Sequence, residues 1–257
     1  MIPKVIHYCW FGGNPLPNSA KLCINSWRKY LPDYEIKEWN ESNFDVNTIP
    51  YTSEAYAAGK YAFVSDYARF LILYEHGGLY FDTDVEVIKP LDDIISRGGF
   101  MGREAGSYLN IDGKTDCLAV APGLGLGVEA HHPLYKEFLD AYDGIHFRNE
   151  DGSLNMKTIV AYATEILCKH GLNSNNEEMQ PLDDLWVYPA DVFCPMNHTK
   201  GNILIITERT VSIHHYDCSW MDHNTWAFKT HLLKNKLIRL FGPKLIGKIA
   251  DIIKGRS

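Results

Sequence analysis

The chain has 257 residues, of which 46% are hydrophobic, and a formal net charge of −7 at pH 7. This length and apolar content suffice for a packed α/β core, and the acidic balance argues against a nucleic-acid-binding protein.

Six cysteines occur without a CxxC pair or zinc-finger spacing, a pattern typical of free thiols in a reducing compartment. We find no secretory signal and no apolar run long enough to span a bilayer. We therefore expect a cytoplasmic protein.

The first segments alternate between strand and helix patterns. We expect a strand over 3–10, a helix from Asn18 or Ser19 to Tyr30, and a second strand over 34–39. A strand, a helix and a further strand in this order favour a parallel sheet.

The next helix is expected to have Ser65 as its N-cap and to end at Gly77. An apolar strand over 79–82 follows, and 85–88 should continue as extended chain. Further along we expect helices over 138–142 and 156–170 and strands over 185–188, 203–207 and 212–216. The expected organisation is one domain over 1–228, with a nucleotide-binding half of about 1–100 and an acceptor-side half of about 101–228.

Residues 229–257 differ in composition from the rest of the chain. They hold eight lysines and arginines and one aspartate, a net charge of +7, together with apolar residues at helical spacing. Such a basic amphipathic segment is typical of peripheral contact with an anionic membrane, here the inner face of the cell membrane. A pair of packed terminal helices with solvated lysines is the alternative.

Asp82 and Asp84 lie two residues apart after an apolar strand, in the stretch GGLYFDTDVEV. In extended chain, side chains two apart point to the same side, so both carboxylates could converge on one Mg²⁺ or Mn²⁺ ion. Ligands of open α/β sheets bind beyond the carboxyl ends of the strands, which makes a metal-bridged diphosphate the economical interpretation. A solvated turn is the alternative, because DxD alone is common.

Other residues could complete such a site. Asp66 and Arg69 are three apart on one helix, where Arg69 could orient Asp66 toward sugar hydroxyls or the two could form a surface ion pair. His214 and His215 point to opposite faces of a strand, so one of them could be a metal ligand.

Two tryptophans end strand-like segments. Trp10 could stack on a nucleobase or pack in the core, and the indole N–H of Trp220 could donate to a phosphate oxygen. The stretch GLGLG over 123–127 lacks the spacing and the position of a dinucleotide-binding fingerprint, so we assign it no cofactor.

Four stretches in this order resemble the DxD sugar transferases of glycosyltransferase family 32. They are IPKVIHYCWFGG, PDYEIKEWN, FVSDYARFLILYEHGGLYFDTDVEV and SIHHYDCSW. The family includes bacterial capsular and surface-polysaccharide enzymes, and the motifs also resemble those of the large glucosylating clostridial toxins.

The resemblance implies an A-type glycosyltransferase fold, with a mixed and mostly parallel sheet between helices. It also implies a nucleotide-sugar donor, commonly UDP-linked, a Mn²⁺ or Mg²⁺ cofactor, retention of anomeric configuration, and a saccharide or lipid-linked saccharide acceptor. By motif, Trp10 would stack on the base, Asn40 would lie near the donor, and Ser65, Asp66, Arg69 and Tyr80 would line the donor sugar and ribose. Asp82 would contact hydroxyls and the metal, Asp84 would bind the metal directly, and Ser219 and Trp220 would close over the diphosphate.

The third metal ligand is our inference from the residues, and we expect it to be His215. The expected catalytic residues are Asp66, Arg69, Asp82, Asp84 and Trp220. A nucleotide-sugar hydrolase using the same site and a non-catalytic sugar-binding module are the alternative functions.

Overall fold

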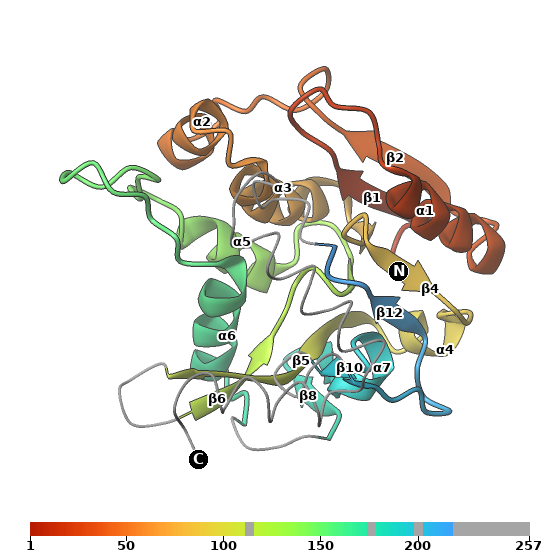
Figure 1. Cartoon of the computed structure of the whole chain (residues 1–257). Coiled ribbons are helices and arrows are strands. Elements are labelled where there is room, and N and C mark those ends of the chain that lie inside the picture. Colours follow the sequence, from red (N-terminus) through yellow and green to blue (C-terminus); the bar gives the residue numbers. More distant parts are fainter. Residues whose placement is uncertain (111–115, 174–177, 198–202, 218–257) are drawn as a thin grey trace, which may run out of the picture.

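A computed structural model describes residues 1–110, 116–173, 178–197 and 203–217. Its core is an eight-stranded mixed sheet with the order β2-β1-β3-β7-β5-β9-β8, and β6 pairs with β5 (Figure 1). Five of these strands share one direction, namely β1, β2, β3, β5 and β9, while β6, β7 and β8 run the opposite way. The expected mixed, mostly parallel α/β sheet is confirmed, and both predicted halves of the chain contribute strands to it.

The elements occupy the following residues. The sheet strands are β1 Val5–Cys9, β2 Glu35–Trp39, β3 Gly78–Tyr80, β5 Gly99–Asn110, β6 Asp116–Val120, β7 Leu126–Val128, β8 Gln180–Leu182 and β9 Leu185–Tyr188. The remaining strands are β4 Val85–Val87, β10 Met196–Asn197, β11 Ile203–Leu204 and β12 Ser212–His214. The helices are α1 Asn18–Tyr30, α2 Pro50–Ala57, α3 Tyr61–His76, α4 Asp92–Ile95, α5 Pro133–Asp140, α6 Ile159–Lys169 and α7 Ala190–Phe193.

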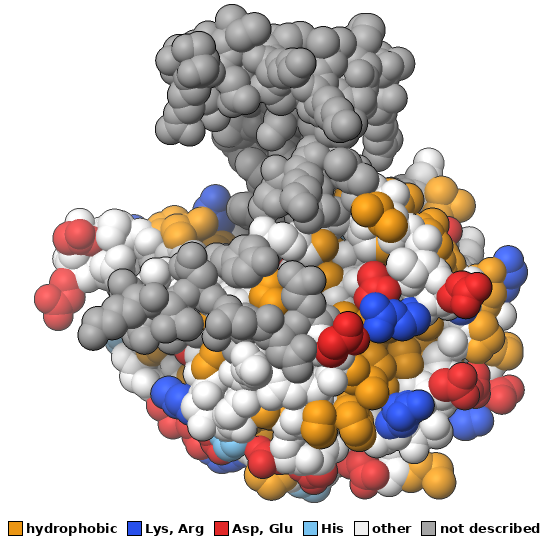
Figure 2. All heavy atoms as spheres, turned by 90° about the horizontal axis from the view of Figure 1, so that it is seen from below, with side chains coloured by type: hydrophobic (Ala, Val, Ile, Leu, Met, Phe, Trp, Pro, Cys, Tyr) orange, Lys and Arg blue, Asp and Glu red, His pale blue; other side chains and the backbone are white. Residues whose placement is uncertain are grey.

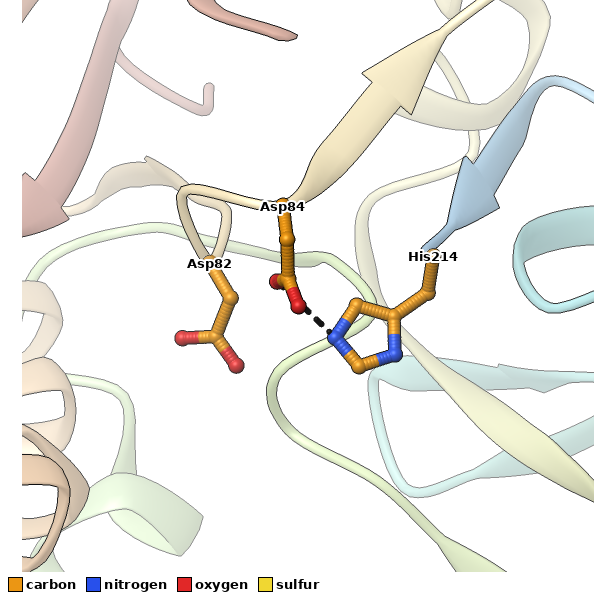
Figure 3. A group of neighbouring side chains, drawn as sticks. All are labelled: Asp82, Asp84 and His214. Atoms are coloured by element: carbon orange, nitrogen blue, oxygen red, sulfur yellow. Dashed lines mark ion pairs between the residues drawn. The ribbon is translucent and has the colours of Figure 1, made fainter. Parts of the chain in front are cut away.

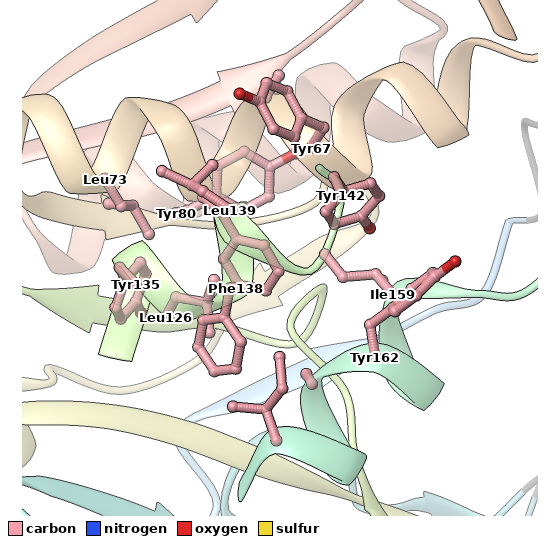
Figure 4. Close-up of a cluster of buried hydrophobic side chains, with 14 of the residues drawn as sticks. Tyr67, Leu73, Tyr80, Leu126, Tyr135, Phe138, Leu139, Tyr142, Ile159 and Tyr162 are labelled. Atoms are coloured by element: carbon pink, nitrogen blue, oxygen red, sulfur yellow. The ribbon is translucent and has the colours of Figure 1, made fainter. Parts of the chain in front are cut away.

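Two hydrophobic clusters cover the two faces of the sheet. One cluster contains residues of α2, α3, α5 and α6, and Figure 4 shows part of it, including Tyr80 beneath α3. The other contains residues of α1 and α7, with Leu79 and Phe81. Since successive residues of an extended strand point to opposite faces, Tyr80 faces α3 while its two neighbours face α1.

Strand β4 does not join the main sheet. It pairs antiparallel with β12, so that Val85 lies opposite His214. Helix α1 holds it from the other side, because Trp27 Nε1 donates to the carbonyl of Val85 at 2.7 Å and Val87 N donates to Ser26 Oγ at 2.9 Å. These contacts fix the chain immediately after the two aspartates.

The helix before the two aspartates starts earlier than predicted. Helix α3 begins at Tyr61, so Ser65 lies inside it, and its hydroxyl donates to the Tyr61 carbonyl at 3.1 Å. The expected N-cap at Ser65 is therefore wrong. The apolar pattern of the preceding turn extends the helix by one turn, and Asp66 lies in its interior.

Two glycines connect α3 to β3 because no other residue fits there. Gly77 has φ 63° and Gly78 has φ 102°. A Cβ on Gly77 would lie 2.7 Å from Ala130 N, and one on Gly78 would lie 2.7 Å from the Val5 carbonyl. This close approach lets β3 lie directly against β1.

Charges of both signs are interspersed on the described surface in Figure 2, among patches of hydrophobic side chains. None of the helices in the described part of the chain is both long and apolar enough to cross a membrane. The basic segment 229–257 lies outside the described residues.

A buried histidine gives the fold a predictable pH dependence. Trp39 Nε1 donates to His7 Nδ1 at 3.0 Å, which leaves His7 Nε2–H to donate to the Gly77 carbonyl at 3.0 Å. Burial lowers the pKa of His7 to about 4, below its ordinary unfolded value of about 6.5. Between these values the unfolded chain binds more protons, so stability is full above pH 6.5 and falls as the pH decreases toward 4.

We expect the wild type to lose roughly 1–2 kcal/mol of unfolding free energy between pH 7.5 and pH 5 through this histidine. His7→Gln should lower stability at neutral pH but lack this component. Urea unfolding of both proteins at the two pH values measures the difference. Equal losses in the two proteins would contradict the assignment.

Candidate metal and donor site

Asp82 and Asp84 lie in a turn between β3 and β4. Val85 N donates to the Asp82 carbonyl at 3.0 Å, which closes the turn. The expected extended chain through Asp82 is therefore wrong, because β3 ends at Tyr80. Both carboxylates nevertheless reach one region, since the turn is held between the end of β3 and the start of β4.

A histidine joins the two carboxylates. Asp82, Asp84 and His214 each offer a ligand atom within 4.8 Å of the others, and Figure 3 shows the three side chains converging. His214 Nε2 lies 3.1 Å from Asp84 Oδ1. Two carboxylates and one imidazole form a suitable donor set for a divalent cation such as Mn²⁺ or Mg²⁺.

The third side chain of this cluster is His214 rather than His215, the expected ligand. His215 Nε2 lies 2.9 Å from Glu86 Oε2, away from the two aspartates. The pairing of β12 with β4 determines this choice, because it places His214 beside Val85, next to Asp84. The candidate third ligand is therefore His214 rather than the expected His215.

Asp84 is held by three contacts from the segment His214 to Asp217. Its carbonyl accepts from His215 N at 3.0 Å, and its Oδ2 accepts from Asp217 N at 2.9 Å. Burial alone would raise the pKa of Asp84, but the charge and hydrogen bond of His214, together with the Asp217 N–H, lower it to about 2. The carboxylate is thus ionised and oriented before any cation binds.

Arg69 connects this site to a second, buried carboxylate. Its Nη2 lies 3.0 Å from Asp66 Oδ1 and its Nη1 lies 3.2 Å from Asp82 Oδ1. The guanidinium also lies over the ring of Tyr80, 4.8 Å from its centroid. Burial raises the pKa of Asp66 to about 6 despite the Arg69 charge. The predicted pair of Asp66 and Arg69 is a buried network rather than a surface ion pair.

Because Gly123 has no side chain, it leaves room for the carboxylate of Asp82. Asp82 N donates to the Gly123 carbonyl at 3.2 Å, and a Cβ on Gly123 would lie only 2.0 Å from Asp82 Oδ2. The GLGLG stretch gives no sign of this role in the sequence. Nothing in the local sequence brings residue 123 to residue 82.

The other predicted donor residues lie at the same sheet edge. Trp10 and Asn40 follow β1 and β2, whose carboxyl ends lie beside that of β3 because the three strands are parallel. Trp10 is half-buried and donates through Nε1 to the Asn14 carbonyl at 2.6 Å. Asn40 Nδ2 donates to Glu38 Oε1 at 2.8 Å.

Two of the predicted donor-binding residues, Ser65 and Tyr80, form hydrogen bonds with Arg69 and Asp82. The Ser65 carbonyl accepts from Arg69 Nε at 3.1 Å. Tyr80 is 1% exposed and donates through its hydroxyl to Asp82 Oδ1 at 3.3 Å. Ser219 and Trp220 lie outside the described residues, so their predicted roles stay predictions.

Residues 17–101 match the family described as "glycosyltransferase sugar-binding region containing DXD motif". The matched stretch covers about a third of the chain and is similar to this family of glycosyltransferases. The match includes Asp66, Arg69, Asp82 and Asp84 and ends before His214.

Two curated relatives are similar over different parts of the chain. Inositol phosphoceramide mannosyltransferase 1 of Schizosaccharomyces pombe is 32% identical over 111 residues, which are 39% of this chain and 33% of the relative. The chain thus spans about a third of that relative. An uncharacterised glycosyltransferase of Acanthamoeba polyphaga mimivirus is 25% identical over 219 residues, 77% of this chain and 79% of the relative.

Among solved structures, a glycosyltransferase involved in glycosylation of the major capsid of PBCV-1 aligns with a TM-score of 0.47 and 10% identity. The alignment covers 93% of this chain and 100% of that chain.

The packing of Gly123 against Asp82 can be tested by a double-mutant cycle. Gly123→Ala should cost about 1–3 kcal/mol of unfolding free energy, because the new methyl group displaces the Asp82 carboxylate. In an Asp82→Ala background the same change should cost less than about 1 kcal/mol, which is a measurable coupling energy. Gly99→Ala, whose Cβ would meet Leu185 Cβ at 3.1 Å, is the matched control and should cost the same in both backgrounds. Additive costs for Gly123→Ala and Asp82→Ala would contradict the contact.

Proposed function

We propose that the protein is a metal-dependent, retaining glycosyltransferase. In this proposal it moves a hexose from a nucleotide sugar, with a UDP-sugar as the first donor to test, to a saccharide or lipid-linked saccharide of surface polysaccharide synthesis. The observation that carries the proposal is the convergence of Asp82, Asp84 and His214 beside the buried pair of Asp66 and Arg69. A cation subsite and a hydroxyl-binding subsite thus share one carboxylate, Asp82.

Each subsite has a separate task in this proposal. Asp84 and His214 would hold a divalent cation, which when bound neutralises the charge that develops on a leaving diphosphate. Asp66 and Asp82 would accept hydrogen bonds from sugar or ribose hydroxyls, in orientations fixed by Arg69. Trp10, at the carboxyl end of β1, would stack on the nucleobase.

The reaction we favour takes place on one face of the sugar. The acceptor hydroxyl oxygen forms a bond to the anomeric carbon while the bond from that carbon to the phosphate oxygen breaks. The hydroxyl proton passes to the leaving phosphate oxygen, so no base from the protein is required. A covalent glycosyl-enzyme intermediate is the alternative route to the same retained configuration.

The relatives bear on the donor and the acceptor. One relative is named a mannosyltransferase that acts on a ceramide lipid. This name supports adding a mannose donor to the panel and a lipid-linked acceptor to the assays. Contact of residues 229–257 with the inner face of the membrane stays a prediction from sequence composition.

A thermal-shift panel of UDP-, GDP-, CMP- and dTDP-sugars, each with and without Mn²⁺, tests the donor class. A ligand at 100 times its dissociation constant adds about 2.7 kcal/mol of stability, which gives a clear shift. We expect a shift with one nucleotide class that requires Mn²⁺ and is lost in Asp84→Asn. Glu86→Gln is the matched control, because its carboxylate contacts His215 instead. The absence of any nucleotide-dependent shift would overturn the proposal.

Product analysis separates transfer from the alternative functions. Transfer requires a glycosylated acceptor, whereas free sugar released equally with and without acceptor would indicate a hydrolase. Binding without turnover, unchanged in Asp84→Asn, would indicate a sugar-binding module.

The choice between the two histidines has its own test. His214→Ala should weaken Mn²⁺ binding by more than about tenfold, since even the partners of metal ligands contribute that much. His215→Ala should bind Mn²⁺ like the wild type, because its imidazole contacts Glu86. Isothermal titration with Mn²⁺ measures both, and the reverse pattern would restore His215 as the ligand.

A further inference from the structure

Within the part of the chain that the structure describes, the ring of His214 has no hydrogen bond of the kind that usually orients a metal-binding histidine. Its Nε2 faces Asp84, while its Nδ1, on the other side of the ring, is buried without a hydrogen-bond partner among the described residues (Figure 3). Histidine ligands normally donate their second N–H to a carboxylate, carbonyl or water, which fixes the ring. Among the described residues, a contact of another kind could orient His214.

That contact is the aromatic ring of Tyr216. The two ring centroids lie 4.0 Å apart with an interplanar angle of 66°. Tyr216 follows the end of β12 and has φ 55°, a conformation that residues other than glycine adopt rarely. This turn of the backbone brings Tyr216 against His214 and presents the next amide, Asp217 N, to Asp84 Oδ2.

The far end of Tyr216 is anchored in the body of the protein. Its hydroxyl donates to Glu104 Oε1 on β5 at 3.0 Å, and it lies 2.8 Å from Sγ of Cys194, just after α7. Cys194 is fully buried. The hydroxyl therefore contacts two residues, Glu104 and Cys194, that belong to neither β4 nor β12. Through these contacts, the side chain of Tyr216 connects the main sheet to the proposed metal site.

We propose that Tyr216, anchored by Glu104 and Cys194, is a positioning residue that holds the imidazole of His214 in place for a divalent cation. This inference rests on the metal site of the proposed function. It adds a part of the chain far from the DxD motif to the determinants of metal affinity. Strand β5 thereby becomes coupled to the ligand set through one hydroxyl group.

The test is a titration of the full chain with Mn²⁺ in the absence of nucleotide. Electron paramagnetic resonance measures the concentration of free Mn²⁺ at each step. Tyr216→Phe keeps the ring but removes the anchored hydroxyl, and we expect its dissociation constant for Mn²⁺ to rise about tenfold. Glu104→Ala and Cys194→Ala remove the anchors and leave Tyr216 intact, and each should weaken Mn²⁺ binding in the same direction. Glu104→Gln keeps an acceptor oxygen and should stay within about twofold of the wild type.

His215→Asn is the matched control, since the neighbouring residue points to Glu86, and it should not alter Mn²⁺ affinity. Melting curves of every variant identify any that fails to fold. If Tyr216→Phe bound Mn²⁺ with wild-type affinity while Asp84→Asn lost it, the positioning role of Tyr216 would be wrong and the metal site would still be supported. A wild type that binds no Mn²⁺ would overturn the metal site and this inference together.

Discussion

The buried guanidinium of Arg69 is the interaction on which the site depends. It is 3% exposed and lies between Asp66, on its own helix, and Asp82, in the turn after β3. Removing one partner of a buried charge leaves the other uncompensated, at a cost of about 3–5 kcal/mol. Arg69 therefore joins α3 to the turn of Asp82 and Asp84, and the proposed hydroxyl-binding and cation-binding parts of the site share one electrostatic network.

Asp82 comes near Arg69 because the chain leaves the main sheet after Tyr80, the last residue of β3. Tyr80 supports Arg69 on one face of β3, while Phe81 packs near Trp27 on the other, with ring centroids 5.5 Å apart. The next strand, β4, is pinned by α1 and β12 instead of continuing the sheet. The two aspartates thus lie in a turn clamped on both sides, which limits how far their repulsion could separate them. In the proposed function, a cation between them would relieve that repulsion.

The proposed donor subsites lie where parallel strands end, and the candidate metal ligands come from distant parts of the chain. Trp10, Asn40 and Asp82 follow three adjacent strands, so the sheet topology gathers them at one edge. His214 and Gly123 reach the same edge from the second half of the chain. The family match over residues 17–101 includes Asn40 and Asp82 but not Trp10, Gly123 or His214.

The sequence alone predicted β1, α1, β2, β3, β4 and most of α3, but not the helices α2 and α4. It also singled out Asp66, Arg69, Asp82 and Asp84, while the mixed sheet was implied by the family resemblance. Local periodicity, glycines with positive φ and carboxylate spacing carry that information, because each acts within a few residues. Only the tertiary structure decided that α3 starts at Tyr61, that the aspartates lie in a turn, and that His214 replaces His215. Pairing of β12 with β4 made the last choice. One register shift would exchange the two imidazoles, since adjacent side chains of a strand face opposite ways. The roles of Gly123 and Tyr216 could not be predicted from the sequence either, because they depend on contacts with residues far away in the chain.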